Sequence, residues 1–198
     1  MVVAALGDSL CGGYLIDGRY VDDANGSYPA LVAQALGATQ LGVVAIASAI
    51  IDTVADGIAL LPPEADLLMM NAGTNDMVVV ASEVRTLEAV VASFEGMLRR
   101  CRSWMPKARV VVVGLRNVAA MDPNHIAGPH SIRRLREPAK VGAAARAFNE
   151  HILTLPNITP VDLARRPGTD SVELFPDAIH PSPLGARWIA DAVLEALR

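Results

Sequence analysis

Four residues have the chemical types needed for acyl transfer. Ser9 lies in the string ALGDSL, Asn75 in NAGTND, and Asp177 and His180 in FPDAIHPSPLG. A serine hydroxyl becomes a useful nucleophile when an imidazole removes its proton, and a carboxylate fixes the tautomer of that imidazole. A side-chain amide can donate to the oxyanion that develops on the substrate. The four residues therefore predict a nucleophile, a base, an orienting group and an oxyanion donor.

The elements that must position these residues follow from the apolar pattern. Five runs rich in β-branched residues predict buried strands, and the stretches between them have apolar residues at helical spacings of three and four. Strands that alternate with helices imply parallel pairing and helices on both faces of one sheet. The 198 residues are expected to form a single α/β domain, residues 1–198. The predicted strands are 2–6, 42–46, 66–70, 109–114 and 158–162, and the predicted helices are 28–37, 53–60, 82–104, 138–155 and 184–197.

The polar strings fall where a binding site is expected in such a sheet. GDSL follows the first strand and NAGTND follows the third, and ligands bind at the carboxyl ends of the strands in open α/β sheets. Asp177 and His180 are three residues apart, a spacing at which one tight turn sets both side chains on the same side. Ser182 and Pro183 have the types of a helix cap and a first helical residue, which would hold the preceding turn in place.

With these blocks the sequence resembles the GDSL, or SGNH, hydrolase family over almost its whole length. The resemblance implies a three-layer α/β/α, flavodoxin-like fold with a five-stranded parallel sheet, and serine esterase chemistry without a metal or cofactor. It also implies an oxyanion hole formed by the Ser9 N–H, the Asn75 side chain and a glycine N–H from a second block. In that second block, AIASAIIDT, Ala49 aligns with the family glycine, so the N–H is retained while a methyl group is added.

Three further residues of these blocks are expected to support the site. They are Asp8 of GDSL and Gly73 and Asp76 of GTND, and Asp76 is expected to brace the loop of Asn75 rather than to react. A simpler interpretation of the first block is that Asp8 and Ser9 only cap the next helix.

A second Asp-x-x-His pair, Asp122 and His125, competes with Asp177 and His180. We prefer the later pair because its continuation HPSPLG leads into the final helix, as in the family. His125 and the nearby His130 are then solvated loop residues, or line the pocket in the less favoured alternative. His151, in a predicted helix, is expected to be structural.

The remaining features limit other classes of function. The formal net charge of −4 gives no electrostatic case for nucleic acid, and no apolar run is long enough to cross a membrane. Cys11 and Cys101 lack the spacing of a zinc site or redox dithiol, and Cys11 is expected to pack beneath the site. No dinucleotide fingerprint, phosphate loop or Gly-x-Ser-x-Gly elbow is present.

A local run of basic residues is expected to be a solvated face, with contact to an anionic part of a substrate as the alternative. Its members are Arg133, Arg134, Arg136, Lys140 and Arg146.

The sequence therefore predicts a hydrolase that cleaves a small-molecule carboxylic ester or thioester through an acyl-enzyme. An acyltransferase with the same residues and a catalytically silent flavodoxin-like binding module remain as alternatives, although a binding module has no need of this set of residues. The amino terminus starts directly in a predicted strand without a charged leader, which predicts a cytoplasmic location.

Overall fold

The centre of the molecule is a five-stranded parallel sheet with the strand order β4-β1-β5-β6-β7. The computed structural model describes residues 1–120 and 137–198. In register, β1 pairs with β4 on one side and with β5 on the other, so the strand that leads to Ser9 is central. The five strands are β1 (Val2–Gly7), β4 (Gln40–Ala45), β5 (Leu67–Asn71), β6 (Arg109–Val113) and β7 (Thr159–Val161).

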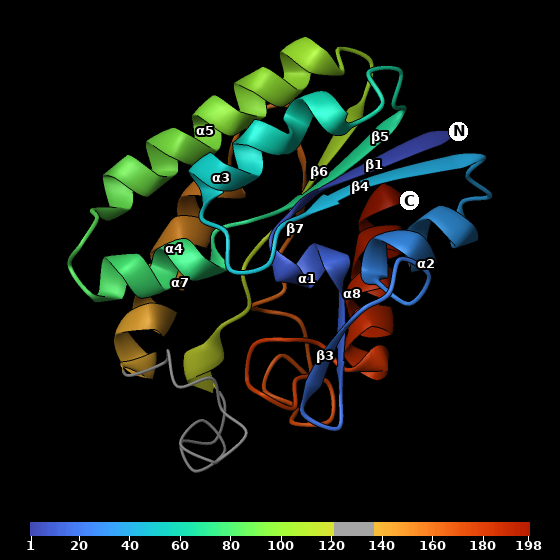
Figure 1. Ribbon diagram of the computed structural model, residues 1–198. Coiled ribbons are helices and arrows are strands. Elements are labelled where there is room, and N and C mark those ends of the chain that lie inside the picture. Colours follow the sequence, from blue (N-terminus) through green and yellow to red (C-terminus); the bar gives the residue numbers. More distant parts are fainter. Residues whose placement is uncertain (121–136) are drawn as a thin grey trace.

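Helices cover both faces of this sheet and give the molecule three layers (Figure 1). Helices α2 (Tyr28–Ala35) and α8 (Pro183–Leu197) lie together on one face. The other face is covered by α3 (Ile51–Asp56), α5 (Leu87–Trp104) and α7 (Pro138–Ile152), with the short α4 (Thr74–Ala81) packed against α7. Because the central strands are covered on both faces, they are almost entirely apolar; residues 67–71 are all buried, and only the last of them, Asn71, is polar. The predicted flavodoxin-like, three-layer α/β fold is confirmed.

Helix α5 shows how the apolar spacing produces this packing. Its buried side chains recur at the spacing of one helical face. Thr86 caps the start of the helix, and its side chain accepts a hydrogen bond from the N–H of Ala89 at 3.2 Å. Phe94 meets Phe148 of α7 edge to face, with 5.6 Å between ring centroids, so the two helices lock together over the sheet. The buried residues of the helix are Val90, Phe94, Met97, Leu98 and Cys101.

The predicted elements agree with the structure except in four places, one of which is helix α4 (Thr74–Ala81), where no helix was predicted. The predicted helix 82–104 begins only at Leu87, since Glu83 has a positive φ of 58° and residues 82–86 connect α4 to α5. The predicted helix 53–60 is α3 followed by the 3-10 helix η1 (Gly57–Leu60). Between β1 and α2, the sequence analysis missed the short helix α1 (Ser9–Gly12) and the hairpin of β2 (Gly13–Ile16) and β3 (Arg19–Asp22).

Beyond β6 the chain forms a short 3-10 helix, η2 (Val118–Ala120), and is described again from Glu137. Among the helices described, none has the length and apolar character needed to cross a membrane.

Candidate active site

Ser9 lies where the central strand β1 turns into α1. The turn is tight, because a Cβ at Gly7 would collide with the carbonyl oxygen of Asn71 and the sulfur of Cys11. Asp8 caps the short helix, and its Oδ1 accepts a hydrogen bond from the N–H of Leu10 at 3.1 Å. The capping interpretation and the nucleophile interpretation are thus compatible: Asp8 caps, and Ser9 is the first residue that follows.

Ser9, His180 and Asp177 form a continuous hydrogen-bonded chain. The Ser9 Oγ lies 2.9 Å from His180 Nε2, and His180 Nδ1 lies 2.8 Å from Asp177 Oδ2. An ionised carboxylate only accepts hydrogen bonds, so Nδ1 of a neutral His180 carries the proton. Nε2 is then the acceptor and the Ser9 hydroxyl is the donor. This is the arrangement in which a serine can lose its proton to an imidazole.

The turn from Asp177 to His180 is held by the carboxylate itself. Asp177 Oδ1 accepts from the N–H groups of Ile179, at 3.0 Å, and His180, at 2.6 Å, which leaves Oδ2 for the imidazole. Between them, Ala178 has a positive φ of 70°, which costs a non-glycine residue about 1–2 kcal/mol. Ser182 caps α8 by accepting from the N–H of Gly185, so the predicted cap is confirmed and the turn is fixed to a long helix.

Asn75 is presented at the first turn of α4, beyond the end of β5. Gly73 has a φ of 120°, and a Cβ there would lie 2.9 Å from the ring of Phe148, so the position requires glycine. The Asn75 Nδ2 donates to the carbonyl oxygen of Ala49 at 2.9 Å. An amide nitrogen has two hydrogens, so one orients the side chain and the other is left for a further acceptor.

The predicted oxyanion donor Ala49 is engaged in a different hydrogen bond. Its N–H donates to the carbonyl oxygen of Ile46 at 3.2 Å, in a turn where Ser48 has a positive φ of 59°. The Ala49 carbonyl, rather than its N–H, is the group that contacts Asn75. A role of the Ala49 N–H toward the substrate stays a prediction, and it requires that this turn opens.

The sequence profile of the GDSL-like lipase/acylhydrolase family matches residues 5–188, and so spans β1, α4 and the Asp177–His180 turn. The chain belongs to this family. Among curated proteins, no sequence matches the chain significantly.

Solved structures of two lipases and a phospholipase share the fold of this GDSL-like protein. The lipase Lip_vut3 from a goat rumen metagenome superimposes with a TM-score of 0.72 at 18% identity, covering 99% of this chain and 97% of that one. Phospholipase A1 from Streptomyces albidoflavus gives 0.67 at 19% identity, with 98% of both chains covered. The extracellular lipase of Streptomyces rimosus gives 0.63 at 20% identity, with 99% of both covered. At these identities the likeness establishes the fold alone, and the cytoplasmic location stays a prediction.

Two buried carboxylates, Asp8 and Asp76, lie next to these segments of the GDSL-like protein. Burial raises the pKa of Asp8 to about 6, although hydrogen bonds with Leu10 and Thr74 oppose the shift. Burial also raises the pKa of Asp76 to about 6, and this carboxylate accepts from the N–H of Ile51 at 2.9 Å. Asp76 therefore ties the start of α4 to the start of α3, in parallel with the hydrogen bond from Asn75 to Ala49, as expected for a bracing residue.

Arg116 is a supporting residue that the sequence analysis missed. Its buried guanidinium donates to the carbonyl oxygens of Ala178 and Thr169 and lies 3.8 Å from the ring centre of Phe175. Burial lowers its pKa to about 9, while the nearby Asp177 acts in the opposite direction. The arginine thus holds the strained turn that carries His180. An arginine just beyond a buried strand, at the edge of the sheet where the site is expected, is the signal that could have identified it.

The other candidate residues lie away from the hydrogen-bonded chain or beyond the described residues. His151 is on the surface of α7 and pairs with Glu95 of α5 at 2.9 Å, in agreement with a structural role. Cys11 is buried, and its sulfur lies 3.2 Å from the hydroxyl of Tyr28. Within the basic run, Arg146 is exposed and Lys140 pairs with Glu137 at 2.9 Å. Six residues of the earlier interpretations fall outside the described residues: Asp122, His125, His130, Arg133, Arg134 and Arg136.

Proposed function

We propose that the protein is a serine hydrolase that cleaves a carboxylic ester or thioester through an acyl-enzyme. Ser9 is the nucleophile, His180 the general base and acid, and Asp177 the group that orients His180. The observation that carries the proposal is the hydrogen-bonded chain from Ser9 Oγ through His180 to Asp177, at 2.9 and 2.8 Å. The family membership supports the same class of reaction.

The reaction has two matched halves. In the first half, His180 Nε2 takes the proton of Ser9 while Oγ forms a bond to the acyl carbon. The resulting tetrahedral intermediate collapses, and His180 gives the proton to the departing alcohol or thiol. In the second half, a water molecule replaces the serine as the nucleophile, His180 takes its proton, and the proton returns to Ser9 Oγ as the carboxylic acid leaves. The imidazolium that forms in each half is stabilised by Asp177, which accepts from Nδ1.

The oxyanion of the intermediate requires donors beside Ser9. The second hydrogen of Asn75 Nδ2 and the N–H of Ser9 are assigned to it, because the Ala49 carbonyl already orients the Asn75 amide. The N–H of Ala49 is assigned as a third donor on one condition. It donates to the carbonyl oxygen of Ile46, so it can reach the oxyanion only if that hydrogen bond breaks.

A small apolar pocket adjoins the proposed site. Its lining includes Leu10, Thr74 and Ile179, which are the chain neighbours of Ser9, Asn75 and His180. The pocket therefore adjoins all three functional segments. Its further lining is mostly aliphatic, with Arg116 as the charged member, and comes from α4, α7 and the segment after β6; the aliphatic residues include Met77, Leu115, Val118, Val141 and Ala145. With a free volume of about 20 Å³, the pocket gives the proposed site an apolar wall rather than room for a whole hydrocarbon chain.

The proposal is tested with a serine-directed organophosphonate and a series of esters and thioesters of graded acyl length. We expect one adduct per chain, located on Ser9 by peptide mass spectrometry, and hydrolysis that is lost together with labelling in Ser9→Ala. An adduct on another residue, with Ser9→Ala still active, would contradict the assignment.

Asn75→Ala is expected to lower kcat by about 10²- to 10³-fold, since a single oxyanion donor typically contributes this much. KM should change little, because the donor is aimed at the transition state rather than at the bound ester. Steady-state kinetics on one ester measures the two separately. Asn25→Ala, at an exposed loop position, is the matched control. A rise in KM at unchanged kcat, with an unaltered melting temperature, would assign Asn75 to substrate binding instead.

A further inference from the structure

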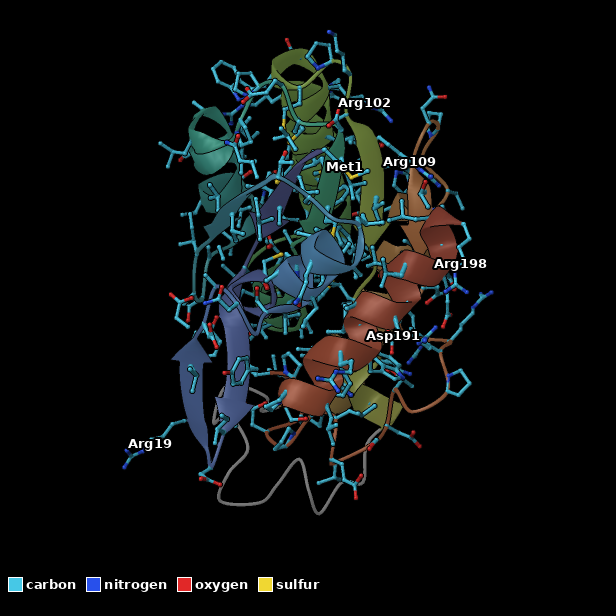
Figure 2. All side chains as sticks on the ribbon, turned by 90° about the vertical axis from the view of Figure 1, so that its right-hand side faces the viewer. Met1, Arg19, Arg102, Arg109, Asp191 and Arg198 are labelled. Atoms are coloured by element: carbon cyan, nitrogen blue, oxygen red, sulfur yellow. The ribbon has the colours of Figure 1, made fainter. Side chains whose placement is uncertain are left out.

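The β2–β3 hairpin is a structural unit separate from the main sheet. Its strands pair antiparallel and are joined by Asp17 and Gly18, both with positive φ, of 48° and 72°. An Asp-Gly pair in this conformation forms the type I′ turn that suits a two-residue hairpin. The hairpin extends from one end of the molecule, and Arg19, beside its turn, points away from the body (Figure 2).

Tyr20 of this hairpin holds the peptide unit that follows the nucleophile. Its hydroxyl donates to the carbonyl oxygen of Ser9 at 2.8 Å. The N–H of the same peptide unit belongs to Leu10 and donates to Asp8 Oδ1 at 3.1 Å. The peptide plane is therefore fixed at both ends, which restricts the backbone rotation that moves Ser9 Oγ. Burial raises the pKa of Tyr20 to about 12, so the phenol stays a donor at neutral pH.

The same hairpin contacts the segment that carries the base. The ring of Tyr20 lies 5.3 Å from the His180 ring between centroids, tilted by 56°. Leu15, the cross-strand partner of Tyr20, donates its N–H to the carbonyl oxygen of Pro181 at 2.7 Å. One cross-strand pair thus bridges two segments of the site that are 171 positions apart in the chain.

Two glycines allow this close approach. A Cβ at Gly12 would lie 2.7 Å from the Tyr20 hydroxyl, and a Cβ at Gly13 would collide with the carbonyl oxygen of Val21. The string CGG after the nucleophile therefore lets the returning strand of the hairpin rest directly on α1.

We propose that Tyr20 is a positioning residue that sets the geometry between Ser9 and His180, with its hydroxyl fixing the nucleophile and its ring packing against the base. This inference rests on the proposed function. It predicts that loss of the hydroxyl slows attack by Ser9 without weakening substrate binding.

The test compares Tyr20→Phe with Tyr14→Phe. Tyr14 lies on the other strand of the hairpin, and its hydroxyl donates to Asp23 at 2.9 Å, so this control also loses one tyrosine hydrogen bond. Tyr20→Phe is expected to lower both kcat and the rate of organophosphonate labelling of Ser9 by about 3- to 10-fold, the effect of one hydrogen bond. KM and the melting temperature should stay near the parent values. Tyr14→Phe should remain within about twofold in both rates.

Tyr20→Leu removes the ring as well as the hydroxyl and is expected to be slower than Tyr20→Phe, so that phenylalanine gives partial rescue. Unchanged labelling in Tyr20→Phe, an equal loss in Tyr14→Phe, or a change confined to KM would each overturn the inference. Failure of the parent protein to be labelled at Ser9 would instead reject the proposed function, so the two failures are distinguishable.

Discussion

Ser9→Ala and His180→Ala are each expected to lower kcat by about 10⁶-fold, and the double variant is expected to be no slower than either single variant. The reason is that neither residue can contribute to the attack on the ester without the other. The Ser9 hydroxyl needs Nε2, 2.9 Å away, to accept its proton, and the imidazole has no bound nucleophile to activate once the hydroxyl is removed. The measurement is single-turnover hydrolysis of a chromogenic ester by the three variants.

The matched control for this experiment is His151→Ala. It removes an imidazole that is also hydrogen-bonded to a carboxylate, but on the surface between α5 and α7, and it should leave kcat unchanged. His125→Ala tests the other Asp-x-x-His pair of the sequence and should retain most of the activity. Additive losses in the double variant would show that Ser9 and His180 do not work as one unit. An inactive His125→Ala would show that the other Asp-x-x-His pair supplies the base.

Most of the fold could be predicted because its main signals are local. Strands buried on both faces must be apolar throughout, so β1, β5 and β6 are visible as runs of Val, Leu, Met and Ala. Amphipathic helices such as α5 show their buried face as a spacing of three and four. Helix α4 was not predicted, and the predicted start of α5 was too early. The turn between the two helices depends on the backbone at Glu83, where no glycine or proline marks the change.

The hairpin was missed for a different reason. Its strands have four residues each, too few for the periodicity of a run to be decisive, and two adjacent glycines lie where α1 ends and β2 begins. The pair Asp17–Gly18 was the available signal, because this dipeptide between alternating residues favours a type I′ turn. The contact of Tyr20 with Ser9 could not be deduced from it, since that contact depends on how the hairpin folds back onto α1.

The central part of the candidate site could be predicted from spacing, whereas the state of the Ala49 donor could not. Asp177 and His180 are close in sequence, so one turn brings them together, and the structure places them 2.8 Å apart. Whether the N–H of Ala49 is free depends on a turn in which Ser48 adopts a positive φ, a conformation that serine seldom takes and the sequence does not indicate. The burial of Arg116 also depends on the tertiary fold, because an arginine is ordinarily exposed.

Asp177→Asn is expected to lower kcat by about 10⁴-fold, the size of effect seen when a triad imidazole is held in the wrong tautomer. The loss of kcat is expected because of the contacts that the Asp177 carboxylate makes. Oδ1 accepts from two backbone N–H groups, those of Ile179 and His180, so the amide oxygen of asparagine must take this place. The amide NH₂ is then directed at His180 Nδ1, where the carboxylate Oδ2 lay.

An amide donor at this position forces Nδ1 to accept, so the proton of a neutral His180 moves to Nε2 and the imidazole can no longer take the proton of Ser9. Nitrogen-15 NMR of the imidazole should therefore report a proton on Nδ1 in the parent protein and on Nε2 in Asp177→Asn. Asp191→Asn, which removes an exposed carboxylate from α8, controls for the change of net charge and should retain full activity. A slow Asp177→Asn variant that keeps the proton on Nδ1 would contradict the tautomer explanation, because the base would then be intact and the loss would have to arise from the turn.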